Sequence, residues 1–153
     1  MKTVVITGAS TGIGRSTAEY LAAKGWQVFA GVRKDKDGDA LVAADARIKP
    51  ILLDVTNPDH VTAAVDTVRE ALGGQKLAGL VNNAGIANMG PLAAQPLDEF
   101  KSHFDVNVFG LLRASQAFAP LLGMDDTLAG KPGRIINITS VGGRLASPVL
   151  GAD

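Results

Sequence analysis

The stretch from Thr7 to Gly14, with the sequence TGASTGIG, most constrains how this chain can fold. It follows an apolar run, Val4–Ile6, and leads into Arg15–Ala23, which has the composition of a helix. A strand, a glycine-rich turn and a helix in this order form the phosphate-binding start of a dinucleotide-binding βαβ unit. Glycines permit the tight turn and let the backbone approach a pyrophosphate, whose charge meets N–H groups at the helix N-terminus. A plain strand-to-helix turn is the alternative, but this context favours a nucleotide site.

Length and composition limit the remaining possibilities. A chain of 153 residues suits one domain, spanning residues 1–153. Hydrophobic residues make up 46% and aromatic residues only 5%, so we expect an aliphatic core of helices packed on a buried parallel sheet. The formal net charge of zero argues against partners such as nucleic acid or an anionic membrane surface. The absence of cysteine excludes disulfides and thiolate chemistry.

Targeting and metal signals are also weak. The apolar run after Met1 is too short for a secretory signal, and no segment has the apolar length that spans a bilayer. These features predict a cytoplasmic protein. His60 and His103 stand beside acidic residues in helical segments, so we expect both on solvated helix faces. No spacing typical of metal ligands appears, and no metal site is predicted.

Strand-like and helix-like segments alternate along the whole chain. Strands are predicted at residues 4–6, 26–32, 50–53, 77–81 and 134–138, and helices at residues 15–23, 40–46, 58–72 and 97–122. Strands that alternate with helices pair in parallel through right-handed crossovers, with helices on both faces of the sheet. The sequence therefore predicts an α/β fold with a Rossmann-like, doubly wound parallel sheet of strand order 3-2-1-4-5. Its ligand should lie at the carboxyl ends of the strands.

The end of the second predicted strand bears on the choice of cofactor. An acidic residue there would bind the ribose 2′-hydroxyl of NAD. Here the strand ends in Arg33, whose guanidinium can pair with a 2′-phosphate, which favours NADP over NAD. Asp35 and Asp37 follow closely, and either could take the acidic role if the turn had a different shape. A solvated charged turn is the third possibility.

Polar residues also follow the third and fourth strands. Asp54 either caps the following helix or accepts a hydrogen bond from an adenine amino group. Asn82 and Asn83 come directly after a buried strand, where their amides either tie neighbouring strands together or contact a ligand. Ala84 and Gly85 are small enough for a flat or sugar-like group to approach closely. A tight turn is the simpler reading of this segment.

Five motifs in chain order give the sequence a wider resemblance. They are Thr7–Gly14, Asp54–Val55, Asn82–Gly85, Asn107 within VNVFG, and Ser140 within NITS. Together they resemble the short-chain dehydrogenase/reductase family, in the subgroup that opens with Thr-Gly-x-x-x-Gly-x-Gly. The resemblance implies an NADP(H)-dependent oxidoreductase that acts on the alcohol/carbonyl pair of a small molecule.

The resemblance also implies roles for individual residues. The diphosphate would be cradled by Gly8, Ser10, Thr11, Gly12, Ile13 and Gly14. Arg33 would meet the 2′-phosphate. The adenine would lie against Asp54 and Val55, and the ribose region against Asn83, Ala84 and Gly85. For catalysis, Ser140 would hydrogen-bond the substrate oxygen and Asn107 would hold a proton-relaying water. Considered without the family, Ser140 is a strand-end cap and Asn107 a helix kink with a satisfied amide.

The chain departs from the family pattern after Ser140. In the family, a tyrosine that transfers the proton lies about thirteen positions after this serine, and a lysine follows it. Here that position is Asp153, the last residue, and the chain's only tyrosine is Tyr20. A carboxyl with a pKa near 4 is ionised at neutral pH and has no proton to give. We therefore expect a C-terminally incomplete, inactive or nearly inactive domain: a dinucleotide-binding module or a non-functional fragment.

An incomplete domain would also expose surface. The last strand should then present an unpaired edge and apolar side chains. This predicts association or marginal stability, and a homo-oligomer is possible because the family usually pairs subunits through the long helix at 97–122.

Overall fold

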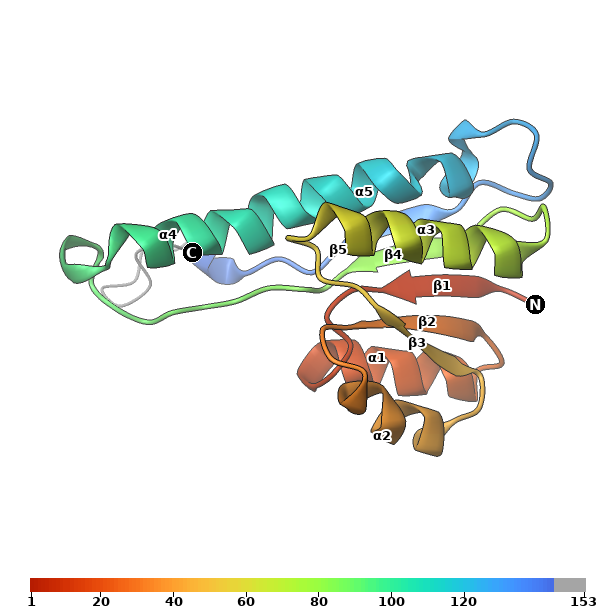
Figure 1. Cartoon of the computed structure of the whole chain (residues 1–153), viewed down its shortest axis with the longest axis horizontal. Helices are drawn as coiled ribbons and strands as arrows, with labels where there is room; N and C mark the ends of the chain where they lie inside the picture. The colour runs from red at the N-terminus through yellow and green to blue at the C-terminus, as the bar shows by residue number, and fades with distance from the viewer. Residues whose placement is uncertain (145–153) are drawn as a thin grey trace.

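The computed structural model describes residues 1–144 and shows a parallel sheet between two layers of helices (Figure 1). The strands in this part of the chain are β1 (Thr3–Ile6), β2 (Gln27–Val32), β3 (Ile48–Leu52), β4 (Gly79–Asn82) and β5 (Arg134–Asn137). They are ordered β3-β2-β1-β4-β5, and each neighbouring pair is parallel. The predicted doubly wound sheet is confirmed.

Helices cover both faces of this sheet. In Figure 1, α1 (Gly12–Ala23) and α2 (Lys36–Ala44) lie on one face, and α3 (Pro58–Leu72) and α5 (Leu111–Ala119) on the other. The remaining helical elements of residues 1–144 are α4 (Leu97–Phe104), η1 (Leu92–Ala94), η2 (Asp105–Gly110), η3 (Pro120–Met124) and η4 (Val141–Gly143). None of the helices in this range is long and apolar enough to cross a membrane.

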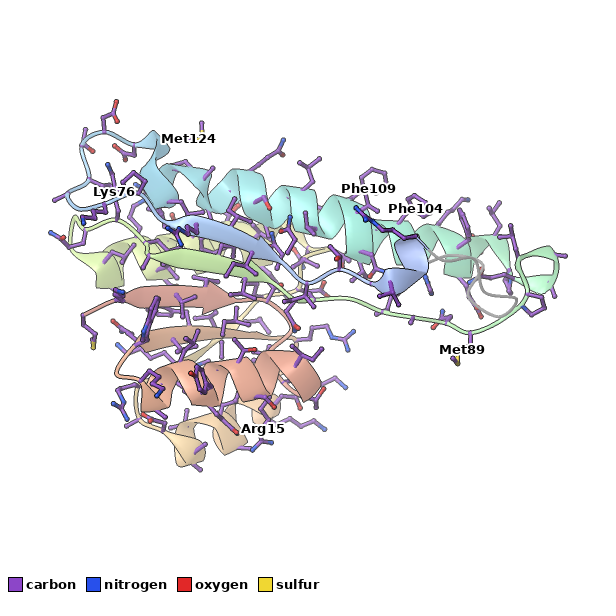
Figure 2. The ribbon with its side chains drawn as sticks, turned by 180° about the vertical axis from the view of Figure 1, so that it is seen from behind. Arg15, Lys76, Met89, Phe104, Phe109 and Met124 are labelled. Atoms are coloured by element: carbon purple, nitrogen blue, oxygen red, sulfur yellow. The ribbon has the colours of Figure 1, made fainter. Side chains whose placement is uncertain are left out.

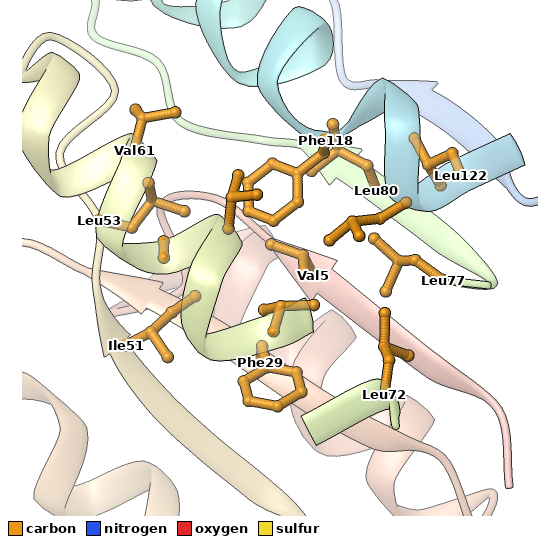
Figure 3. Close-up of a cluster of buried hydrophobic side chains, with 14 residues drawn as sticks. Val5, Phe29, Ile51, Leu53, Val61, Leu72, Leu77, Leu80, Phe118 and Leu122 are labelled. Atoms are coloured by element: carbon orange, nitrogen blue, oxygen red, sulfur yellow. The ribbon is translucent and has the colours of Figure 1, made fainter. Parts of the chain in front are cut away.

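The pleat of β1 divides the core between the two faces. Val5 points into the cluster beneath α3 and α5, which Figure 3 shows with Phe29, Leu80 and Phe118. Val4 and Ile6 point into the cluster beneath α1 and α2. Side chains alternate in this way because successive residues of a strand face opposite sides. Burial on both faces explains why β1 is wholly apolar after Thr3.

Helix α1 begins at Gly12 rather than Arg15 and β1 at Thr3 rather than Val4, and two further elements also begin earlier than the sequence suggested. Helix α2 starts at Lys36 rather than Ala40, and it includes Gly38. A Cβ at Gly38 would lie 2.6 Å from the Cβ of Pro50, so the glycine lets α2 pack closely on β3. Strand β3 starts at Ile48 rather than Pro50, so the proline lies inside the strand. A proline is tolerated there because β3 is an edge strand of the sheet.

The region predicted as one helix at 97–122 is helical throughout, but it changes twice from α-helical to π-helical turns. Helix α4 passes into the π-helical turns of η2, which lead into α5 and then into the π-helical η3. Gly123 ends the path with a φ of 146°. Such π-helical turns inside α-helices are frequent at functional sites.

Strand β5 lies at an edge of the sheet and is exposed along its whole length. Ile135, Ile136 and Ile138 expose 44%, 53% and 41% of their surface. Among the described residues, the predicted apolar edge is therefore present. Association through this edge stays a prediction, which sedimentation equilibrium of the chain over a range of concentrations would test.

Candidate dinucleotide site

A cleft of about 450 Å³ lies where the strands of the sheet end. It is lined by Gly8, Ser10, Thr11, Gly31, Arg33, Leu53, Asp54, Val55, Thr56, Asn83, Ala84, Gly85, Ile86, Ser102, Asp105 and Val106. The volume is in the range of sites for small molecules and cofactors. The lining comes from the ends of β1, β2, β3 and β4, as the topology predicted.

The glycine turn is fixed to both strands that neighbour β1. The backbone N–H of Thr7 donates to the carbonyl oxygen of Val81 (3.0 Å), and that of Ala9 donates to Gly31 (2.8 Å). Helix α1 then begins without a side-chain cap at Thr11. In residues 1–144, the N–H groups of Gly12, Ile13 and Gly14 have no acceptor. Such free donors at a helix N-terminus suit a phosphate. Of the turn residues predicted to cradle it, Gly8, Ser10 and Thr11 line the cleft, whereas Gly12, Ile13 and Gly14 do not.

Two glycines of this turn have no room for a side chain. Gly8 has a φ of 64°, and a Cβ there would lie 2.7 Å from the Cα of Ala84. A Cβ at Gly14 would overlap the amide nitrogen of Asn83 and the carbonyl oxygen of Gly8. Gly14 therefore lies behind the turn, supporting it, rather than on the cleft surface.

Thr7 and Asn83 lock this turn to the end of β4. The Thr7 hydroxyl accepts hydrogen bonds from the backbone N–H groups of Asn83 (3.0 Å) and Ala84 (2.9 Å). In return, the Asn83 amide Nδ2 donates to the carbonyl oxygens of Thr7 (3.1 Å) and Gly8 (2.9 Å). Four hydrogen bonds thus hold the glycine turn against the segment predicted to meet the ribose.

The neighbouring amide, Asn82, ties strands together. Its Nδ2 donates to the Ser115 hydroxyl and to Oδ1 of Asn137, both at 2.9 Å. It therefore joins β4 to β5 and to α5. Of the two roles considered for paired amides, tying neighbouring elements holds for Asn82.

Arg33 lies in the cleft with Asp54, whereas Asp35 and Asp37 do not line it. Asp35 precedes α2, and Asp37 lies in the first turn of that helix. The Arg33 charge is close enough to help lower the pKa of Asp54. The end of β2 therefore presents a cation to the cleft, while the acidic residues belong to the helix start.

Asp54 shapes the turn after β3. Its Oδ1 accepts hydrogen bonds from the backbone N–H (2.9 Å) and hydroxyl (2.7 Å) of Thr56. Partial burial raises the pKa of Asp54, but these two hydrogen bonds and the charges of Arg33 and His60 outweigh it and leave the pKa below its usual value. The carboxylate is thus ionised at neutral pH. The capping alternative joined Asp54 with Thr56 and Asn57. Asn57 is the cap of α3, whereas the Asp54 carboxylate bonds to Thr56 and makes no bond to the helix.

Asn107 and Ser140 do not line the cleft. Asn107 lies in η2, where its Oδ1 accepts from the N–H of Ile86 and its Nδ2 donates to the Ile86 carbonyl oxygen, both at 2.9 Å. The Ser140 hydroxyl accepts from the N–H of Gly142 (3.0 Å) and caps η4. Their assigned catalytic roles stay predictions. Asp153 lies outside the described residues.

The expectation for the two histidines was wrong. His103 is 2% exposed, and its Nε2 accepts a hydrogen bond from the backbone N–H of Asn88 (2.8 Å). His60 is half-buried rather than on a solvated face. The segment after β4 runs alongside α4 and covers His103, and no local sequence signal shows that contact.

Sequence reasoning also missed one wall of the cleft. Ser102, Asp105 and Val106 line it from α4 and η2, and their spacing of three and four residues places them on one helical face. That periodicity could have identified them as a group. Arg113 of α5 donates to the carbonyl oxygen of Val55, a long-range contact that the sequence does not signal.

Comparisons with known proteins agree with this geometry. Residues 2–152 match the family described as short chain dehydrogenase. The mitochondrial D-beta-hydroxybutyrate dehydrogenase of Rattus norvegicus is 38% identical over 96% of this chain and 43% of its own length. The NADPH-dependent 3-dehydrocapnine reductase of Ornithobacterium rhinotracheale is 35% identical over 99% of this chain and 53% of its own length.

Solved structures of short-chain dehydrogenases are also similar to this chain. A short chain dehydrogenase/reductase from Burkholderia phymatum, in complex with NAD, superposes with a TM-score of 0.85 at 34% identity. The match covers 99% of this chain and 53% of that one. A short-chain type dehydrogenase/reductase from Mycobacterium marinum superposes with a TM-score of 0.88 at 33% identity. That match covers 99% of this chain and 62% of the other. The chain thus spans 43% to 62% of the length of these four proteins.

Proposed function

Because the chain belongs to the short-chain dehydrogenase family, we propose that it forms the NADP(H)-binding part of an oxidoreductase for an alcohol/carbonyl pair. The observation that carries the proposal is the cleft itself, where Ser10 and Thr11, directly before the uncapped start of α1, line one space with Arg33. A dinucleotide phosphate needs the first feature, and a 2′-phosphate the second.

The lining residues suit the parts of such a cofactor. The diphosphate would bind beside Ser10 and Thr11, close to the free N–H groups of Gly12 and Ile13 at the start of α1, and Gly8 lets the turn pack closely against Ala84. Arg33 would pair with the 2′-phosphate, and Asp54 would accept from the adenine amino group. Gly85 and its neighbours would face the nicotinamide ribose. When bound, the cofactor would accept or supply a hydride.

The substrate would be a small-molecule alcohol or carbonyl compound, as the names of the hydroxybutyrate dehydrogenase and the dehydrocapnine reductase indicate for those two relatives. Ser140 follows β5 at the carboxyl edge of the sheet, the side where α/β proteins bind ligands. There its hydroxyl would hydrogen-bond the substrate oxygen. Asn107 would hold a water close to Ile86 for proton relay.

A second candidate is a module that binds the dinucleotide without turning over a substrate. The observation in its favour is the position of Tyr20, the tyrosine of the described residues. It lies on α1, is 63% exposed and does not line the cleft, so it is not placed to donate a proton there. Cofactor binding without hydride transfer would support the module, and hydride transfer at an ordinary enzymatic rate would support the enzyme.

We further propose that copies of the chain pair through the outer face of α4, η2 and α5. This face exposes Phe104 by 40%, Phe109 by 54% and Leu112 by 49%. Figure 2 labels the two phenylalanines on the outer side of the long helical path. Clustered apolar side chains on a surface are typical of interaction sites.

Changing Arg33 to alanine tests the choice of cofactor. We expect the Kd for NADPH to rise ~10–100-fold, because a charge-assisted hydrogen bond to the 2′-phosphate is lost. The Kd for NADH should change by no more than about threefold, since NADH lacks that phosphate. Isothermal titration calorimetry with both cofactors measures the two values. Lys34→Ala is the matched control, because Lys34 carries the same charge but does not line the cleft. An equal change for both cofactors would contradict the assignment.

A further inference from the structure

The His103 imidazole is buried and takes no part in the function proposed above. Its Nε2 accepts the backbone N–H of Asn88 at 2.8 Å. An imidazole nitrogen that accepts a hydrogen bond carries no proton, so the neutral ring holds its proton on Nδ1. In the described part of the chain Nδ1 has no hydrogen-bond partner. The bond from Asn88 to Nε2 is therefore the hydrogen bond that the described residues give this imidazole.

The partner of His103 lies on a segment with few other attachments. Residues 86–89 leave the end of β4 and run beside α4, with Met89 on the far part of this segment (Figure 2). Within residues 1–144, these four residues have two hydrogen-bonded ties to the rest of the protein. Asn107 holds both backbone groups of Ile86, and His103 holds Asn88.

Both sides of this contact belong to the same wall of the cleft. Gly85 and Ile86 line the cleft just before Asn88, and Ser102 and Asp105 line it on either side of His103. The hydrogen bond therefore joins the two segments that form this wall. Arg33 and Asp54 lie at the other end of the lining, after β2 and β3.

We propose that His103 is a positioning residue for the nicotinamide half of the dinucleotide site. The inference rests on the function proposed above. By holding Asn88, the Nε2 atom keeps Gly85 and Ile86 in place as the wall beside the nicotinamide ribose. Asn88 is exposed, so its N–H can turn to water when the acceptor is removed. Losing this bond should therefore alter the position of the segment more than the stability of the fold.

The effect should separate the two halves of the ligand. The compound 2′,5′-ADP carries the adenine, one ribose and the 2′-phosphate, which meet Arg33 and Asp54, but it lacks the nicotinamide half. Removing the imidazole should weaken binding of NADPH and leave binding of 2′,5′-ADP unchanged. A general loss of folding would weaken both.

The test compares three changes at this position in the 153-residue chain, by calorimetric titration with NADPH and 2′,5′-ADP. For His103→Ala we expect the Kd for NADPH to rise ~5–10-fold, about the value of one hydrogen bond, and that for 2′,5′-ADP to stay within about twofold. His103→Gln should restore NADPH binding, because its Oε1 can reach the place of Nε2. His103→Asn should not, because its amide is one carbon shorter. Lys101→Ala, at an exposed site on α4, should behave as the unmodified chain.

The outcomes separate the inference from the proposed function. If His103→Ala leaves NADPH binding unchanged, or weakens both ligands equally, the positioning role is wrong. A failure of His103→Gln to restore binding also contradicts it. If the unmodified chain binds neither ligand while folded, it is the proposed function that fails.

Discussion

Replacing Gly14 with alanine is expected to abolish measurable NADPH binding and to lower the free energy of unfolding by ~3 kcal/mol. The added Cβ would overlap the Asn83 amide nitrogen and the Gly8 carbonyl oxygen. Those two atoms are hydrogen-bonded to each other at 2.9 Å, so neither can move without breaking the lock between the turn and β4. Urea unfolding measures the stability, and titration with NADPH measures the binding.

Gly74→Ala is the matched control for this change. Gly74 has a φ of 83°, so alanine there is strained, but no atom lies within 4 Å of the added Cβ. It should cost ~1 kcal/mol and leave NADPH binding intact, because Gly74 lies outside the cleft. A Gly14→Ala variant that binds NADPH as well as the unmodified chain would contradict the packing argument.

Asn83→Asp is expected to destabilise the fold by ~3 kcal/mol at pH 8 and by less at pH 5. The amide Nδ2 donates to the carbonyl oxygens of Thr7 and Gly8, and a carboxylate would turn an acceptor toward both. This repulsion raises the pKa of the introduced carboxyl in the folded state above its unfolded value near 4. The destabilisation therefore grows as the pH rises from the unfolded pKa to the folded pKa, and it is constant above the folded pKa. At lower pH the protonated acid can donate to one carbonyl.

Asn83→Ala separates the loss of donors from the added charge. It should destabilise by ~1–2 kcal/mol, by an amount that does not change between pH 5 and pH 8. Urea unfolding of both variants and the unmodified chain at the two pH values gives the comparison. If the cost of Asn83→Asp is also the same at both values, its side chain does not face the two carbonyls.

Local signals explain why much of the fold could be predicted. Helix α3 was placed at 58–72 and is found at Pro58–Leu72, because proline suits the first helical turn and Gly73 adopts the left-handed conformation that ends it. The order of the strands followed from the alternation of strands and helices, since right-handed crossovers leave few arrangements. The glycine turn fixed where the cleft would lie.

Contacts between distant segments explain what was missed. His103 follows Ser102 and stands two residues before Asp105, so its sequence surroundings are polar. It is nevertheless buried, because the irregular segment after β4 lies against it. Arg113 lies in α5, and nothing in its sequence surroundings indicates a long-range partner. Its guanidinium donates a hydrogen bond to the carbonyl oxygen of Val55, on the loop after β3. Neither contact follows from periodicity or composition, because both depend on how two loops fold over helices.

The places of Asn83 and Asp54 in the cleft could be predicted from the sequence, but their contacts could not. Their residue types and positions after strands identified them as polar groups of the cleft, where both lie. Their hydrogen-bond partners could not be predicted, because they depend on the exact approach of Thr7 and Thr56. An amide or carboxylate at the end of a strand therefore predicts that the residue lines the cleft more reliably than it predicts the residue's hydrogen-bond partner.

Direct titration of the 153-residue chain with NADPH is the most direct test that the cleft is a dinucleotide site. We expect saturable binding of one NADPH per chain, displaced by 2′,5′-ADP and ~10-fold tighter than the binding of NADH. A chain that unfolds cooperatively in urea, and so is folded, but shows no saturable binding of either dinucleotide would contradict this expectation.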